Sequence, residues 1–404
     1  MEVYFDNSAT TRVDDNVIEV IEKVMREDYG NPSSKHMKGL DSETYLRNAR
    51  ESLAGILKVS EKEIIFTSGG TESNNMAIIG AALANQRKGK HIVTTCFEHA
   101  SVSEPLKYLE KYICKDGESF RVTYLPVDRN GHISLSDLRN AMTPDTILVT
   151  IMMVNNEIGA LQDIAGIGKL IKDMNPECVF HVDAIQAFAK YSIFPKKMNI
   201  DLLSVSSHKF HGPKGMGFLY KNEKIRINPL ILGGGQQKGM RSGTDNVPGA
   251  AGMRQAAENA YKNLSDITAG LTELKDYMTE GLEKYADEIS TTPEGRAGSC
   301  YIKLNSRKGN ESAPHIVSAV FFPVKSEVML HALEERGVYV SSGSACSSNK
   351  PGLSGTLEAI GLSAREADCT LRFSFCRYNT REEADYALEQ IRICYGMLRK
   401  FTSH

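Results

Sequence analysis

The sequence Ile200-Asp201-Leu202-Leu203-Ser204-Val205-Ser206-Ser207-His208-Lys209 carries a lysine shortly after a largely apolar run. A short apolar run of this kind is typical of a strand that is buried on both faces. Such a strand would deliver Lys209 into a pocket. A second apolar run, Val179-Phe180-His181-Val182, lies upstream and ends at Asp183, with Gln186 three residues later. The two runs therefore predict an amine and a carboxylate at neighbouring strand ends.

An amine and a carboxylate in this arrangement suit pyridoxal phosphate. This cofactor needs a lysine amine to form a Schiff base with its aldehyde, and an acid partner that keeps its pyridine nitrogen protonated as an electron sink. Lys209 and Asp183 fit these two roles. Read singly, each has a simpler explanation, because Lys209 could be a solvated surface lysine and Asp183 a turn residue at a strand end.

Composition narrows the class of protein. The chain has 404 residues, of which 41% are hydrophobic, and this length predicts two or three domains. Its net charge is -2 and it has no block of like charges, so nothing resembles a nucleic-acid-binding face. The N-terminus has no signal-peptide pattern, and no apolar run approaches the roughly 20 residues that span a bilayer. We therefore expect a cytoplasmic protein without membrane contact.

The cysteines and histidines do not predict a metal site. The eight cysteines are scattered without a Cys-x-x-Cys pair, which fits neither a zinc site nor a secreted disulfide framework. His208 and His211 are the only close histidine pair worth testing, and no carboxylate or thiol cluster accompanies them. We expect no bound metal.

Between about residues 62 and 220, short apolar runs alternate with helical patterns, notably 72–86, 101–109 and 164–174. This alternation predicts βαβ units and a mostly parallel sheet with helices on its faces, in which ligands bind beyond the carboxyl ends of the strands. The predicted strands are 64–66, 92–94, 122–124, 147–149, 179–182, 202–205 and 217–219.

One loop of this region is a candidate phosphate seat. Thr67-Ser68-Gly69-Gly70-Thr71-Glu72 lies between a predicted strand and a predicted helix. Its glycines let backbone N–H groups approach an anion, and the helix N-terminus adds partial positive charge. An ordinary helix N-cap explains the same residues. Both readings stay open from the residues alone.

The C-terminal third predicts a smaller domain. Its expected strands are 301–304, 317–321 and 371–374, and its expected helices include 326–335 and 381–401, after two helices at 248–263 and 268–285. The segment Ser341-Ser342-Gly343-Ser344-Ala345-Cys346 is polar and poor in apolar anchors, so we expect a mobile loop. A cysteine in such a loop is retained more plausibly for reactivity than for packing.

Taken together, these motifs resemble a known family over nearly the whole chain, the cysteine desulfurases of the NifS/IscS type within the class V aminotransferases. The resemblance rests on several separate stretches of sequence. They are Asp6-Asn7-Ser8-Ala9-Thr10-Thr11, Gly30-Asn31-Pro32-Ser33-Ser34, Thr67-Ser68-Gly69-Gly70-Thr71-Glu72-Ser73, Glu98-His99, Val154-Asn155-Asn156-Glu157-Ile158-Gly159, His181-Val182-Asp183-Ala184, Ser206-Ser207-His208-Lys209, Gly239-Met240-Arg241-Ser242-Gly243-Thr244 and Ser341-Ser342-Gly343-Ser344-Ala345-Cys346.

The resemblance implies a role for each matching residue. Lys209 would form the Schiff base and Asp183 would pair with the pyridine nitrogen. His99 would stack on the cofactor ring and help to deprotonate the reacting thiol, and Gln186 would bond the phenolic oxygen. Cys346 would attack the sulfur of the substrate L-cysteine, leaving a persulfide on the enzyme and releasing alanine. The remaining implied contacts are Gly70, Thr71, Asn156, Ser206, His208 and Thr244 of the partner subunit with the cofactor, and Asn156 and Arg372 with the substrate carboxylate.

The resemblance also implies an α/β architecture, that of the fold type I pyridoxal-phosphate transferases. We expect an N-terminal segment (1–15) associated with the small domain, a large cofactor-binding domain (16–260) and a small α+β domain (261–404) carrying the cysteine loop at about 341–354. A homodimer and a sulfur-acceptor protein, such as an iron-sulfur scaffold, would be the partners. His315 follows Pro314 where the family more often has asparagine, a departure that we expect to touch none of the catalytic roles.

Three alternatives stay open at this point. The chain could be a selenocysteine lyase, because selenocysteine differs from cysteine by one atom. It could run another class V reaction, although transamination needs no loop thiol. It could also be a sulfur-trafficking scaffold without catalysis, although such a protein would be expected to have lost Lys209, Asp183 or Cys346, and all three are present.

Overall fold

A computed structural model describes residues 1–309, 311–342 and 354–401. Its larger sheet has seven strands in the order β2-β8-β7-β6-β5-β3-β4. Only β8 runs against its neighbours, so the predicted mostly parallel sheet is confirmed. The strands are β2 (Ile64–Thr67), β3 (His91–Thr95), β4 (Arg121–Leu125), β5 (Thr146–Met152), β6 (Val179–Asp183), β7 (Leu202–Ser206) and β8 (Gly217–Lys221).

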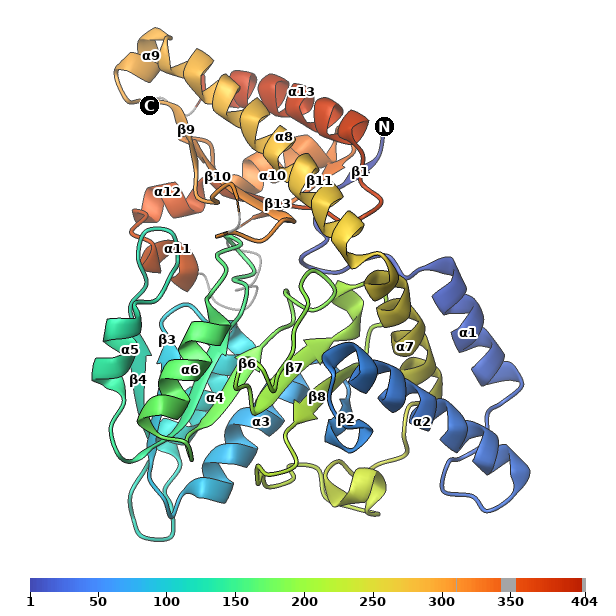
Figure 1. Cartoon of the computed structure of the whole chain (residues 1–404). Helices are drawn as coiled ribbons and strands as arrows, with labels where there is room; N and C mark the ends of the chain where they lie inside the picture. The colour runs from blue at the N-terminus through green and yellow to red at the C-terminus, as the bar shows by residue number, and fades with distance from the viewer. Residues whose placement is uncertain (310, 343–353, 402–404) are drawn as a thin grey trace.

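Helices cover both faces of this sheet (Figure 1). Consecutive residues of a strand point to opposite faces, so Leu203 packs in the core beneath one set of helices and Leu202 in the core beneath the other. The first set is α1 (Asp15–Arg26), α2 (Met37–Leu57), α5 (Leu135–Ala141), α6 (Ile164–Met174) and α7 (Val247–Lys262). The second set is α3 (Gly70–Asn85) and α4 (Ala100–Lys111).

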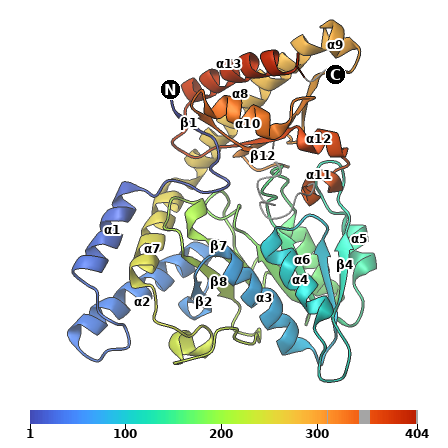
Figure 2. The same ribbon diagram turned by 180° about the vertical axis from the view of Figure 1, so that it is seen from behind.

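A second core surrounds a four-stranded antiparallel sheet of order β12-β13-β10-β9. Figure 2 shows this unit above the larger sheet, with the long helices α8 and α13 on its outer side. Its elements are α8 (Leu264–Ser290), α9 (Pro293–Arg296), β9 (Tyr301–Leu304), β10 (Ile316–Phe322), α10 (Ser326–Glu334), β12 (Ser341–Ser342), α11 (Gly355–Ala359), α12 (Ala364–Asp368), β13 (Thr370–Ser374) and α13 (Arg381–Leu398). The helix expected at 268–285 is longer at both ends, and the helix expected to reach 401 ends at Leu398.

The N-terminal segment joins this second unit. Strand β1 (Val3–Tyr4) pairs in parallel with β11 (Val338–Tyr339), and Asp6 forms an isolated bridge with Ser374 of β13. From there the chain crosses to the larger sheet, where Thr11 bonds the carbonyl of His208. The N-terminus therefore connects the two units beside Lys209. The exact domain limits stay a prediction.

A buried lysine gives the fold an expected pH dependence. Lys275 of α8 is 2% exposed and its Nζ donates to Ser312 Oγ and to the Ala313 carbonyl, both at 2.8 Å. Burial lowers the pKa of Lys275 from 10.5 to about 8. Between these values the unfolded chain holds a proton that the folded chain has lost, so the free energy of unfolding rises as the pH rises through this window.

We therefore expect a Lys275→Met variant to lose part of this rise, by at most about 1.4 kcal/mol per pH unit. Guanidinium unfolding at a series of pH values from about 8 to 10 measures the difference. Tyrosines also titrate in this range, so the free energy of unfolding of the variant is expected to change with pH as well. The pH profile of the variant is therefore compared with that of the parent. Parallel profiles of the parent and the variant would contradict the assignment.

Candidate active site

The predicted site residues meet at the carboxyl edge of the larger sheet, where β2, β3, β5, β6 and β7 end. A cavity of about 390 Å³ opens there, and Ser341 and Arg372 of the smaller sheet close its other side. Its lining includes every described residue that the sequence predicted for the site except Thr244. These residues are Gly70, Thr71, His99, Asn156, Asp183, Gln186, Ser206, His208, Lys209 and Arg372.

A larger hollow of about 670 Å³ lies at the opposite edge, where β6 and β7 begin. Two of its lysines are paired with carboxylates, Lys172 with Asp201 and Lys88 with Glu177. Ligands of parallel sheets bind at the carboxyl ends of the strands. The smaller cavity is therefore the candidate site.

Lys209 follows β7 at the end of a single 3₁₀ turn, Ser207–Lys209. Its Nζ donates to the carbonyl oxygens of Ser8 at 2.5 Å and of Ala9 at 2.9 Å. The amine therefore lies at the cavity wall, held by uncharged acceptors of the N-terminal segment.

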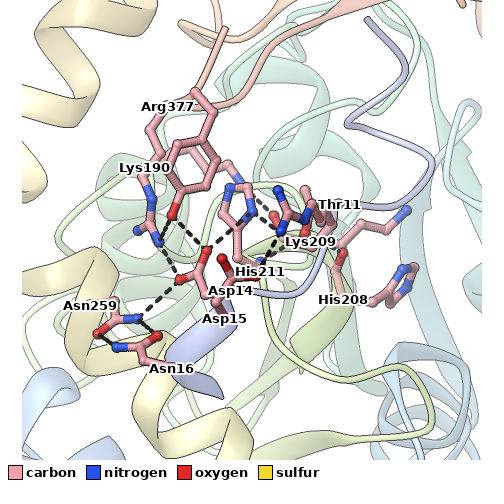
Figure 3. Close-up of polar contacts among 12 residues, drawn as sticks. Thr11, Asp14, Asp15, Asn16, Lys190, His208, Lys209, His211, Asn259 and Arg377 are labelled. Carbon is pink, nitrogen blue, oxygen red and sulfur yellow. Dashed lines mark hydrogen bonds and ion pairs between the residues drawn. The ribbon is translucent and has the colours of Figure 1, made fainter. Parts of the chain in front are cut away.

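Thr11 holds the residues on either side of Lys209 in the chain (Figure 3). Thr11 Oγ1 donates to the His208 carbonyl at 3.0 Å and accepts from the His211 backbone N–H at 2.8 Å. Next to it, Asp14 bonds both Arg377 and Asn259. These contacts tie the turn to the N-terminal segment, and they tie that segment to α7 and to the segment after β13, so Lys209 has little freedom to move.

A second buried lysine lies behind the first. Lys190 Nζ donates to the carbonyl of Lys209 at 2.6 Å. Burial, together with the charge of Lys209, lowers the pKa of Lys190 to about 7. Lys190 does not line the cavity, but it is a second buried amine next to Lys209 that the sequence analysis did not single out.

Asp183 ends β6 and is 5% exposed. One carboxylate oxygen accepts from the Ile185 backbone N–H at 2.9 Å and the other from Asn74 Nδ2 at 2.8 Å. Burial raises the pKa of Asp183, which means that desolvation penalises its charged form. A cationic group placed against this carboxylate would relieve that penalty, as the protonated nitrogen of a pyridine ring would.

The loop before α3 borders a hollow at the position where the sequence predicted a phosphate seat. This hollow of about 440 Å³ beside the main cavity is lined by Gly69, Gly70, Thr71, Ser206 and His208, among others. Gly69 has φ of +147°, which favours glycine, and a Cβ on Gly70 would lie 2.2 Å from the side chain of Ile185. Backbone and hydroxyl donors at a helix N-terminus fit a phosphate group.

His315 contacts a residue predicted for the site, a contact that the sequence analysis did not anticipate. His315 is buried, and its Nε2 lies 3.3 Å from Gln186 Oε1. An amide oxygen only accepts, so His315 donates. Gln186 Nε2 then donates to the Ser8 carbonyl at 3.0 Å, which Lys209 also contacts. His315 comes from the segment before β10, far away in sequence, so no local pattern could reveal this contact.

His99 begins α4 and faces the cavity. Its Nδ1 lies 2.8 Å from Ser101 Oγ and 3.1 Å from the Ser101 backbone nitrogen. Desolvation lowers the pKa of His99, the charge of Asp183 opposes this shift, and the charge of Lys209 adds to it. At neutral pH these influences favour the neutral ring.

Arg372 of β13 lies opposite Lys209. Its Nη1 donates to the Asn156 carbonyl at 2.9 Å and its Nη2 pairs with Asp6 at 2.8 Å. Its Nε is buried without a hydrogen-bond partner among the described residues. A guanidinium that lines such a cavity suits a carboxylate ligand.

One described residue that was predicted for the site, Thr244, does not line this cavity. Thr244 is exposed, outside the cavity, and its neighbour Arg241 pairs with Glu72 of the same chain at 2.9 Å. Cys346 lies outside the described residues, as does most of the loop expected at 341–354.

In the part of the chain that the structure describes, no group of three or more His, Cys, Asp or Glu side chains is arranged to hold a metal. None of the described helices is long and apolar enough to cross a membrane.

Comparison with known proteins places these features in context. The family model described as aminotransferase class-V matches residues 3–387. The chain is 42% identical over 400 residues to the cysteine desulfurase IscS of Methanosarcina thermophila, spanning 99% of this chain and 93% of that protein. It is 40% identical over 403 residues to the cysteine desulfurase IscS of Dictyoglomus turgidum, spanning 100% and 97%. The solved structure of a NifS-like protein is similar with a TM-score of 0.88 and 37% identity, covering 98% of this chain and all of that chain.

Proposed function

The chain belongs to the class-V aminotransferase family and is a cysteine desulfurase of the IscS/NifS type, and on that premise we propose how its own residues hold the cofactor, bind cysteine and move the sulfur. The observation that carries the proposal is the convergence of Lys209, Asp183 and Arg372 on one cavity. These side chains supply an amine, a buried carboxylate and a guanidinium. The reaction needs one of each.

The family depends on pyridoxal phosphate, which when bound supplies an electron sink through its protonated ring. Lys209 would hold the cofactor aldehyde through its amine. Asp183 would hold the ring N–H, and Gln186 would donate its remaining amide hydrogen to the phenolic oxygen. Gly70, Thr71, Ser206 and His208 would hold the phosphate at the N-terminus of α3. Burial lowers the pKa of His208 to about 4, so this ring is neutral and binds by hydrogen bonding, not by charge.

Arg372 and Asn156 would bind the substrate carboxylate. The Asn156 carbonyl and Asp6 hold the guanidinium plane in place, which leaves the unpartnered Nε and further N–H groups to donate. Fixing the carboxylate at this end orients the amine of cysteine towards Lys209 and its sulfur away from the cofactor seat. Orientation of this kind is a large part of catalysis.

Cys346 would take the sulfur. Its thiolate attacks the substrate sulfur, the S–S bond forms as the C–S bond breaks, and a proton completes the methyl group of alanine. The products are L-alanine and a persulfide on Cys346. Of the two histidines that line the cavity, His208 is assigned to the phosphate, and His99 would move a proton at these atoms. The persulfide would then pass to an acceptor, such as an iron-sulfur scaffold protein.

We infer a homodimer from the same set of residues. Thr244 is exposed in this chain, and the apolar residues that precede its glycine-rich segment are exposed as well, with Leu232 79% exposed. A partner subunit that covers this surface would bury them and could bring Thr244 to the neighbouring phosphate seat. Location in the cytoplasm stays a prediction of the sequence.

The reaction is tested with the purified, cofactor-loaded protein, cysteine and a reductant. Alanine and sulfide are expected in equal amounts, because each turnover makes one alanine and one persulfide sulfur. Selenocysteine in a parallel assay addresses the alternative substrate. A loaded protein that releases neither alanine nor sulfide would overturn the proposal.

The role of Arg372 leads to a prediction about substrate affinity. An Arg372→Lys variant keeps the positive charge but loses the planar fork that can bind a carboxylate through two hydrogen bonds. We expect KM for cysteine to rise by about 10- to 100-fold, the size of one charge-assisted hydrogen bond, with a smaller change in kcat. Steady-state kinetics measure the changes in KM and kcat separately. Arg365→Lys, at an exposed arginine of α12, is the matched control, and an unchanged KM in Arg372→Lys would rule out the assignment.

A further inference from the structure

His99 has a second function in the fold, because its side chain caps helix α4. The ring nitrogen Nδ1 accepts from the backbone N–H of Ser101 at 3.1 Å, as an N-cap side chain does. A backbone amide can only donate. Nδ1 must therefore carry a lone pair and not a proton, because a proton there would face the amide hydrogen.

The neighbours of the Ser101 hydroxyl determine which group accepts its hydrogen. Asn74 Nδ2 lies 2.8 Å from Ser101 Oγ and 2.8 Å from Asp183 Oδ2, and an ionised carboxylate can only accept. Both hydrogens of the Asn74 amide are used in this way, one on each oxygen. Ser101 Oγ thus accepts from Asn74 and donates its own hydrogen to His99 Nδ1 at 2.8 Å.

The four groups form one chain of hydrogen bonds with a fixed direction. Asn74 is fully buried, Asp183 is 5% exposed and Ser101 is 6% exposed, so water has little access to exchange these bonds. The Oδ1 atom of Asn74 has no partner among the described residues. Turning the amide over would place that oxygen against the carboxylate, so the observed orientation is the stable one.

We propose that Asn74 and Ser101 are positioning residues that hold His99 as the neutral tautomer with its proton on Nε2. Nδ1 receives two donors, from the hydroxyl and the backbone N–H of Ser101, and the positive end of α4 further opposes a proton there. The remaining ring proton is on Nε2. This inference rests on the proposed function only in taking His99 as a residue of the active site.

The consequence is an order of events for His99. In this tautomer the ring enters the reaction as a proton donor, and it can accept a proton at Nε2 only after it has given one up. The family resemblance implied that the resting ring deprotonates a thiol. For that role, Nε2 would have to carry no proton. The relay opposes that form.

Charged groups on several elements face this ring or border it. Asp183 comes from β6 and Lys209 from the turn after β7, and both act on the His99 pKa. Asp6 and Arg372 line the far side of the cavity and pair with each other. Glu98, the preceding residue, accepts from Thr95 and from the Met152 backbone. None of these contacts supplies an acceptor for a proton on Nδ1.

The test is ¹⁵N NMR of histidine-labelled protein, with and without pyridoxal phosphate, and with His99 assigned from a His99→Gln variant. Near neutral pH we expect Nδ1 to give the signal of a bare ring nitrogen and Nε2 that of a protonated one, in both forms of the protein. A protonated Nδ1 in the unloaded protein would overturn the proposal. Because the unloaded protein runs no reaction, this readout is independent of the proposed function.

Variants of Ser101 give a second readout. Ser101→Ala removes the hydroxyl donor, so we expect the acid limb of the kcat profile, and the NMR titration of His99, to move up by roughly half to one pH unit, the size of one hydrogen bond. Ser101→Thr keeps the hydroxyl and is expected to restore both. Ser103→Ala, on the same helix but bonded to His99 only through its backbone, is the control and should leave both unchanged.

The outcomes separate the two proposals. A titration in Ser101→Ala that matches the parent would overturn the relay even if the enzyme makes alanine. The expected tautomer in a protein that makes no alanine would leave the relay standing and overturn the proposed function instead.

Discussion

Replacing Lys209 by alanine is expected to abolish alanine formation and to leave a folded protein without covalently held cofactor. Removal of a positioned proton-transfer group alone costs about 10²- to 10⁴-fold in rate, and here the attachment point is lost as well. The fold should survive, because the Ser8 carbonyl keeps its bond from Gln186 and the turn keeps its bonds to Thr11. Absorbance of the purified protein and an alanine assay measure both effects.

Lys209→Arg is the matched control for the charge of Lys209. Arginine can keep donors directed at the Ser8 and Ala9 carbonyls, but its guanidinium stays protonated and cannot form a Schiff base. We expect Lys209→Arg to be as inactive as Lys209→Ala and at least as stable. Alanine production by either variant would mean that the catalytic amine is elsewhere.

Replacing Cys346 by serine is expected to stop sulfur transfer without releasing the cofactor. Cys346 lies outside the described residues, so this expectation rests on the sequence and on the chemistry of the thiol. An unperturbed cysteine has a pKa of about 8.5 and supplies some thiolate near neutral pH, whereas a serine hydroxyl supplies essentially no alkoxide. The variant should still change its absorbance on addition of cysteine, and it should form no persulfide.

Cys96→Ser is the control for Cys346→Ser, because Cys96 is an exposed cysteine at the end of β3. It should keep the parent activity. If Cys346 were only a tolerated surface thiol, its replacement would also change little. Sulfide release by Cys346→Ser at the parent rate, or a persulfide located by mass spectrometry on another cysteine, would refute the assignment.

Much of the fold could be predicted because strands covered on both faces read as continuous apolar runs. All seven strands of the larger sheet were predicted within a few residues, and the helix at 164–174 matches α6 at both ends. The meeting of Asp183 and Lys209 followed from the same reading, because the carboxyl ends of parallel strands meet at one edge, whereas His99, Asn156 and Arg372 were assigned through the family resemblance.

Features that depend on long-range contacts could not be predicted. The reversed direction of β8 follows from the short connection at 207–216, which is below the dozen or so residues that a parallel crossover needs, but the apolar run itself gives no direction. The pairing of β1 with β11 joins two-residue strands more than 300 positions apart. His315 reaches Gln186 and Asn74 reaches Ser101 only through the tertiary fold.

The central claim is that Lys209 is the amine that holds the cofactor, and Lys190 is its nearest rival. Lys190 Nζ bonds the Lys209 carbonyl, and the pKa of Lys190 is lowered to about 7, which would also make it a reactive amine. Borohydride reduction of the loaded enzyme, followed by proteolysis and mass spectrometry, fixes the cofactor to whichever lysine holds it. We predict a single adduct on the peptide that contains Lys209, and its absence from Lys209→Arg. An adduct on Lys190 or on any other lysine would contradict the account.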